Sequence, residues 1–174
     1  MDRQLVITVI AQDRPGLVES LAALVAQHDG NWLESRMSRL GGQFAGILRV
    51  RVPAARKVAL ISALEDLANA GIRTQVQPDE PAAPADGSRL AEFQLTGQDR
   101  PGIVRQISEV FARYGVNVEE LTTECRSAPM SGEVLFHVEA QVRIPAECPL
   151  AQMKAGLERI ASDLMVDATL KEIG

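Results

Sequence analysis

Hydrophobic and polar residues alternate along the first 77 residues in a way that predicts six short elements. The first is a run of β-branched residues, typical of a strand, and apolar residues at helical spacing follow it. Gly41-Gly42 is a hairpin signal between two strands, and Gly71 is placed to end a second helix. The elements are expected over residues 5–10 (strand), 17–28 (helix), 32–40 and 44–52 (strands), 58–68 (helix) and 72–77 (strand).

The second half of the chain repeats this order. Each half therefore reads β-α-β-β-α-β, the ferredoxin-like split βαβ pattern. Right-handed crossovers place both helices on one face of an antiparallel sheet, so the predicted fold class is α+β with two such domains. The other face is expected to be polar or covered. The second set of elements is expected over residues 90–96, 103–114, 116–126, 133–144, 150–164 and 165–173.

A duplication explains the repeated order. The string Gln-Asp-Arg-Pro-Gly occurs at residues 12–16 and again at 98–102, an offset of 86 (98 − 12). The third strands end at prolines whose offset is 92 (145 − 53), so the second unit is expected to have gained six residues near that strand's end. Its hairpin loop, residues 127–132, is also expected to be less compact. Further identities at the offset of 86 are Asn31 with Asn117, Glu34 with Glu120 and Gly46 with Gly132.

A stretch rich in proline and alanine separates the two units. It has no periodic apolar residues and is expected to be a semi-extended linker. The predicted domains are therefore residues 1–77 and 89–174, joined by residues 78–88. Units this small bury a limited fraction of their surface. They are expected to pack on each other or on a second chain, which favours a homo-oligomer.

Charge and composition exclude several classes of partner. The net charge is −5, and an acidic chain does not supply the phosphate neutralisation that dominates nucleic-acid affinity. No apolar run approaches the roughly 20 residues that span a bilayer, and the start of the chain has no signal-peptide layout. The expected location is the cytoplasm, with no membrane partner. Cys125 and Cys148 are not equivalent in the repeat and are expected to be buried thiols rather than a disulfide.

The repeated turn has the chemistry of an anion receptor. Asp13 and Asp99 are expected to be N-caps, because a carboxylate accepts hydrogen bonds from the amides of a helix's first turn. The free amides and partial positive charge of a helix N-terminus attract a carboxylate. Asn31 and Asn117 open the second strands, and an asparagine both donates to a carboxylate and accepts from an ammonium. The repeated turn and the side-chain amide of the asparagine together favour a receptor for a small amino acid.

These residues resemble the ACT domain. The resemblance rests on the β-α-β-β-α-β order, the Asp-Arg-Pro-Gly-Leu/Ile-Val turn and the asparagine at the start of strand two, and it covers both units. A stand-alone tandem of two such domains is similar to transcriptional regulators of glycine cleavage. The resemblance implies a sensor of glycine or a related amino acid. It also implies action through a partner transcription activator rather than through direct contact with nucleic acid.

The resemblance also implies where the effector binds. ACT domains bind effectors between two domains, with the turn of one facing strand two of the other. Amides of the turn would hold the carboxylate and the asparagines would fix its orientation. In the first unit the bulky Trp32 could narrow or close the pocket. The implied ligand-binding residues are Asp13, Arg14, Pro15, Gly16, Leu17, Val18 and Asn31, with Asp99, Arg100, Pro101, Gly102, Ile103, Val104 and Asn117.

Catalytic chemistry is absent from the sequence pattern. The only two histidines have no metal-ligand neighbour at useful spacing, and no phosphate-binding or nucleophile motif occurs. No enzyme activity, cofactor or metal is therefore expected. Two alternatives to a sensor remain open: a ligand-independent protein–protein adaptor, and the regulatory subunit of an enzyme of amino-acid metabolism.

Overall fold

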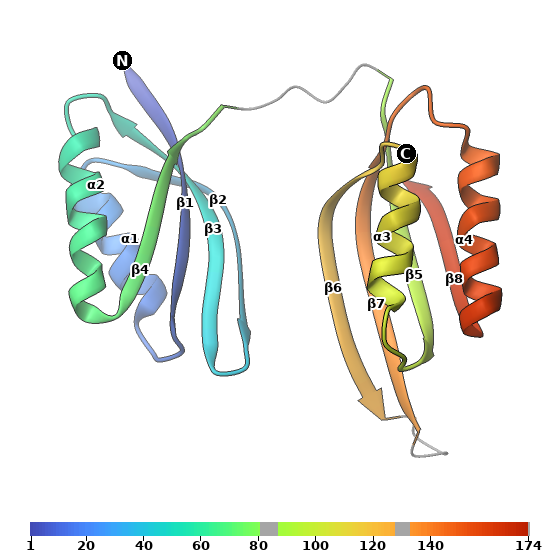
Figure 1. Cartoon of the computed structure of the whole chain (residues 1–174). Coiled ribbons are helices and arrows are strands. Elements are labelled where there is room, and N and C mark those ends of the chain that lie inside the picture. The colour runs from blue at the N-terminus through green and yellow to red at the C-terminus, as the bar shows by residue number, and fades with distance from the viewer. Residues whose placement is uncertain (81–86, 128–132, 174) are drawn as a thin grey trace. The chain divides into compact units, whose positions relative to one another are not determined.

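The computed structural model describes residues 1–80, 87–127 and 133–173. The chain forms two compact units, Met1–Ala82 and Ala83–Gly174, which are described one at a time (Figure 1). The predicted linker, residues 78–88, includes residues 81–86, which lie outside the described residues. Within the described ranges, no helix is long and apolar enough to cross a bilayer.

Unit one is an antiparallel sheet with its helices on one side. The strand order is β2-β3-β1-β4, and the central strands β1 and β3 pair from Asp2↔Pro53 to Gln12↔Gln43. The elements in chain order are β1 (Asp2–Gln12), α1 (Leu17–Gln27), β2 (Asn31–Leu40), β3 (Gln43–Pro53), α2 (Lys57–Asp66), a 3-10 turn η1 (Leu67–Ala70) and β4 (Ile72–Pro78).

Unit two repeats this topology. Its strand order is β6-β7-β5-β8, with all neighbours antiparallel. The predicted α+β class and the two ferredoxin-like units are confirmed. Apolar residues recur at every second position in the observed strands and about every 3.6 positions in the observed helices, which is why the pattern predicted them. The elements are β5 (Arg89–Gln98), α3 (Ile103–Arg113), β6 (Asn117–Ser127), β7 (Val134–Ile144), α4 (Leu150–Leu164) and β8 (Val166–Ile173).

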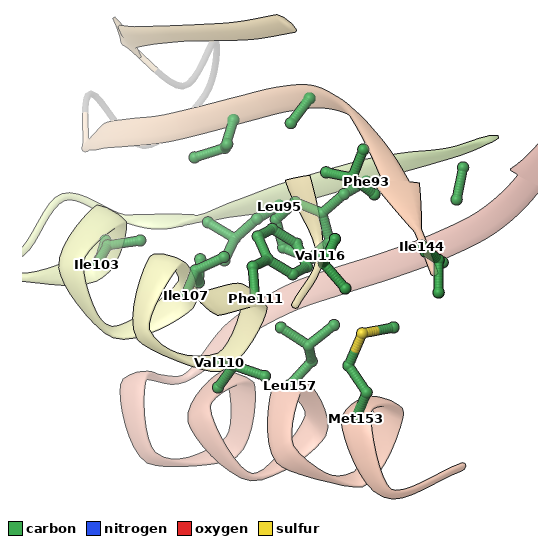
Figure 2. Packing of buried hydrophobic residues seen from close by; sticks show 14 of the residues in the cluster. Phe93, Leu95, Ile103, Ile107, Val110, Phe111, Val116, Ile144, Met153 and Leu157 are labelled. Carbon is green, nitrogen blue, oxygen red and sulfur yellow. The ribbon is translucent and has the colours of Figure 1, made fainter. Parts of the chain in front are cut away.

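Each unit has a core of its own between the sheet and its helices. Every second residue is buried against the helices from Leu5 to Ala11 in β1 and from Ala91 to Leu95 in β5. In unit two Phe93 lies at the centre of the core, with its ring edge-to-face on Phe111 at a centroid distance of 5.3 Å (Figure 2). The two cores share no residue. The sheet face away from the helices is called the open face below.

The inserted residues of unit two lie in its β6–β7 connection. The Asp13 amide donates to the Gly42 carbonyl, and the Asp99 amide donates to the Val134 carbonyl. Gly42 and Val134 are thus equivalent, an offset of 92 (134 − 42), and all of β7 keeps this offset. The prediction that the six residues were gained near the end of the third strand was wrong, and Gly46 corresponds to Val138 rather than to Gly132. Residues 128–132 of the predicted loop lie outside the described residues.

The cysteines differ in exposure. Both are free thiols, as expected, but Cys125 is exposed on β6, so the prediction that both are buried was wrong for this residue. Every position of its strand is exposed. Cys148 is buried, and that burial raises the pKa of its thiol. Its sulfur lies 3.9 Å from Met153 Sδ.

The end of α4 offers a stability test. Gly71, which follows η1 in unit one, has φ 77, whereas Met165 takes the equivalent left-handed position after α4 with φ 53. A side chain in that conformation costs roughly 1–2 kcal/mol, of which the greater flexibility of an unfolded glycine cancels part. Met165 is 69% exposed, so no core contact is lost. Met165→Gly is expected to raise the free energy of unfolding of unit two by about 0.5–1 kcal/mol in urea titrations, whereas Met165→Ala should give no gain. A loss of stability in the glycine variant would contradict the strain assigned to this position.

Candidate functional site

The repeated turn lies between the first strand and the first helix of each unit. Its glycine immediately precedes the helix in a left-handed conformation, with φ 89 at Gly16 and φ 94 at Gly102. Neither helix has a side-chain cap, so the predicted capping by Asp13 and Asp99 was wrong. The physical reason is position: a cap must directly precede the first helical residue, and each aspartate is four residues ahead of it.

The helix starts therefore present free main-chain donors. The first bond inside α1 runs from the Ser20 amide to the Gly16 carbonyl at 2.9 Å, and in α3 the Gln106 amide donates to the Gly102 carbonyl at 3.0 Å. The three amides that precede each of these, at residues 17–19 and 103–105, donate to none of the described residues. Unpaired amides at a helix N-terminus form an anion-binding site.

The glycine of the turn is needed for its backbone angle. A Cβ built on Gly16 would meet no atom within 4 Å, and on Gly102 the nearest atom would be Gln106 Nε2 at 3.8 Å. Space is thus available inside the unit, and only the positive φ disfavours other residues.

The two turns share five residues but make different side-chain contacts. In unit one the Asp13 carboxylate pairs with Arg39 Nε at 2.6 Å, and Arg14 Nη2 donates to the Ala70 carbonyl at 2.6 Å. In unit two Cys125 takes the place of Arg39, and Arg100 Nη2 donates to Gln98 Oε1 at 3.2 Å. Through these side chains the first turn is tied to the rest of its unit, whereas the side chain of Arg100 contacts only the strand that precedes its turn.

The asparagines lie at the opposite end of each sheet from the turn. Asn31 is opposite Arg51, which pairs with Gln4, whereas the turn follows Gln12. Eight residues of strand separate the two levels, about 27 Å at about 3.4 Å per residue. The cause is topology, because β2 runs parallel to β1 and starts where β1 starts. The expectation that turn and amide lie close together was wrong within one unit.

Unit two shows the same separation. Asn117 is opposite Arg143, which pairs with Leu90, and the turn follows Gln98. Both asparagines are exposed, and their side chains bond to none of the described residues. Arg143 is held by Glu119, whose hydrogen bond raises the pKa of the guanidinium. A receptor that uses both a turn and an asparagine therefore needs two units.

A small apolar crevice lies along α3 in unit two. Its volume is about 20 Å³, and it lies between α3 and β6, with Val104 of the first helical turn and Val118 at its border. This space holds about one water molecule. In unit one Trp32 stands at the position of Val118 and packs, half-buried, against the core. The crevice of unit two is therefore too small to enclose an amino acid.

Comparisons with known proteins agree with this fold. Residues 3–77 match the family model of the ACT domain. The glycine cleavage system transcriptional repressor of Escherichia coli (strain K12) is 23% identical over 97% of this chain and 90% of its own length, and the protein of the same name from Shigella flexneri matches equally. An unknown protein from Galdieria sulphuraria has a crystal structure 32% identical over the whole of both chains, with a TM-score of 0.88. A crystal structure assigned to a glycine cleavage system transcriptional repressor is 21% identical, with a TM-score of 0.69 over 99% of this chain and 98% of its own.

Proposed function

We propose that this chain is a tandem ACT-domain protein, similar to the glycine cleavage system transcriptional repressor, that works as an amino-acid-responsive regulator. In this proposal it is a cytoplasmic transcriptional regulator of glycine cleavage and not an enzyme. The observation that supports it best is the duplicated helix start, with its uncapped amides. A carboxylate is the group that such a start binds.

The ligand is a small amino acid held by main-chain donors. The amides of residues 103–105 in unit two, and of residues 17–19 in unit one, bind its carboxylate. Hydrogen bonds to a charged group contribute about 1.5–3 kcal/mol each. The asparagine that fixes the ammonium comes from a different unit, because it lies about 27 Å from the turn of its own. The crevice of about 20 Å³ leaves little room for a side chain, which favours glycine.

Binding then changes the surface offered to a partner. An amino acid bridging two units favours the arrangement in which both contact it, and it shifts the population toward that state. The shift is limited by the difference between its affinities for the two states. The partner in this proposal is a transcription activator, because the net charge of −5 disfavours direct contact with nucleic acid.

Calorimetric titration tests the sensing step. Glycine and the other amino acids are titrated into the full chain, and glycinamide, which lacks the carboxylate, serves as the matched control. Heat of binding is expected for glycine or a similarly small amino acid and not for glycinamide. Flat traces for all amino acids, with protein shown to be folded by circular dichroism, would remove the proposal.

One observation favours an adaptor without a ligand as the second candidate. Strand β6 is an edge strand, and all eleven of its residues, Asn117–Ser127, are exposed. Exposed edge strands bind extended segments of other proteins by main-chain hydrogen bonds. An adaptor of this kind would show no heat in the titration above and would bind its partner equally with and without amino acids.

A further inference from the structure

The open faces of the two sheets have the same shallow depression. It measures about 170 Å³ in unit one and about 110 Å³ in unit two. Six lining positions correspond one to one through the duplication, at an offset of 86 on the first two strands and 92 on the third. In unit one they are Val6, Glu34, Arg36, Ile47, Leu48 and Arg49, and in unit two Glu92, Glu120, Thr122, Glu139, Ala140 and Gln141.

The two open faces carry different charges at equivalent positions. Two arginines of the first depression have become Thr122 and Gln141 in the second, and two apolar residues have become Glu92 and Glu139. Beyond the depression Arg73 of β4 corresponds to Asp167 of β8. The charged residues of the first open face are Arg36, Arg49, Arg51, Arg73, Asp2 and Glu34, and those of the second are Glu92, Glu120, Glu124, Glu139, Asp167, Arg126, Arg143 and Lys171.

The first open face is therefore basic and the second acidic. Formal charges sum to +2 (four arginines, two acids) and −2 (five acids, three bases). Asp79, whose carboxylate lies 3.5 Å from Arg49 Nη1, offsets one of the two net positive charges, so that the first face keeps a net charge of +1. The basic face also exposes apolar surface, with Ile10 38% and Ile47 45% exposed. A surface that is both apolar and charged in one sign is typical of a site that another protein covers.

We propose that the occupant is a second copy of this chain. The basic open face of one copy stacks on the acidic open face of the other, and a two-fold axis repeats the contact with the roles exchanged. Two sheets with the same topology pack face to face at about 10 Å. The opposite charges steer this pairing and disfavour contact between like faces. The covered isoleucines are removed from water.

Interface area supports the reciprocal arrangement. Four strands spaced about 4.8 Å apart and about 25 Å long give a face of roughly 500 Å². One such contact falls below the roughly 800 Å² per partner of a stable interface, whereas the two-fold dimer covers about 1,000 Å² of each chain. In such a two-fold dimer, both open faces of each chain are covered by the other copy.

Charge reversal tests the proposal by sedimentation velocity at low salt, without any amino acid. The acidic variant is Arg51→Glu with Arg73→Glu, and the basic variant is Glu92→Lys with Glu139→Lys. The unmodified protein is expected at twice the chain mass of 18.8 kDa, and each variant alone at the mass of one chain. In a 1:1 mixture both contacts join opposite charges again, so the mass is expected to return to that of the dimer.

The control changes charge by the same amount elsewhere. Glu65→Lys with Glu158→Lys adds four charge units on exposed helical positions and should leave the dimer intact. Circular dichroism establishes that every variant is folded. Unmodified protein at the mass of one chain, variants that keep the dimer, or a mixture that stays dissociated would each overturn the proposal. Because no amino acid is present, these outcomes are independent of whether the sensing function holds.

Discussion

Replacing Phe93 by alanine is expected to lower the free energy of unfolding of unit two by about 3–5 kcal/mol. The side chain is 1% exposed and lies at the middle of β5, where its ring packs edge-to-face on Phe111 at an interplanar angle of 88° (Figure 2). Alanine removes the buried ring and leaves a cavity that the sheet and two helices fill only in part. Such a loss is a large fraction of the stability of a domain this small.

Unit one provides the reference in the same experiment. The single tryptophan, Trp32, lies in unit one and the single tyrosine, Tyr114, in unit two. Urea unfolding is followed by Trp32 fluorescence for unit one and by hydrogen exchange of peptides from each unit. The matched variant Ile7→Ala removes the equivalent core residue of unit one and should lower the stability of that unit instead, by about 2–5 kcal/mol. A Phe93→Ala protein with unchanged exchange in unit two would contradict the core described here.

Replacing Asn117 by alanine is expected to weaken amino-acid binding by about 10- to 100-fold while leaving the fold intact. The proposal gives its carboxamide a hydrogen bond to a charged group of the ligand, worth about 1.5–3 kcal/mol. The side chain is exposed and bonds to none of the described residues, so its removal should change the free energy of unfolding by no more than about 0.5 kcal/mol. Calorimetry measures the affinity and urea unfolding the stability.

Two further variants sharpen the interpretation. Thr123→Ala alters an exposed polar residue of the same strand and should leave the affinity unchanged. Asn31→Ala asks whether the asparagine of unit one contributes as well, although Trp32 follows it and packs against the core. Unchanged affinity in both asparagine variants would separate these residues from any ligand and favour a receptor made by the turns alone.

The sequence predicted the bounds of the elements of this fold to within three residues. Strong periodicity is the reason: β1 buries every second residue from Leu5 to Ala11, and α1 buries Leu17, Leu21 and Val25. These patterns are local, and each periodicity fits only one type of secondary structure that buries all of its apolar residues on one face. The duplicated string then fixed the unit boundaries closely enough to identify two equivalent halves.

The candidate site was predicted less well, because it depends on backbone angles and on topology. The string Gln-Asp-Arg-Pro-Gly is compatible with two helix starts, one capped by the aspartate side chain and one preceded by a glycine in the left-handed conformation. In the structure the glycine precedes the helix. The distance from Asn31 to the turn follows from the direction of β2. A parallel relation between β1 and β2 was implicit in the predicted topology and excludes a single-unit receptor. The opposite charges of the open faces emerge only when strand register assigns each residue to a face.

Amide chemical shifts provide the most direct test of the central claim, that free helix-start amides receive the carboxylate of an amino acid. A ¹⁵N-labelled chain is titrated with the amino acid that gives heat in calorimetry, and in parallel with its amide analogue. The predicted result is saturable shifts at the amides of Ile103, Val104 and Arg105, alone or with those of Leu17, Val18 and Glu19, caused by the amino acid and not by the analogue. Saturable shifts confined to other residues, with both turns unmoved, would contradict it.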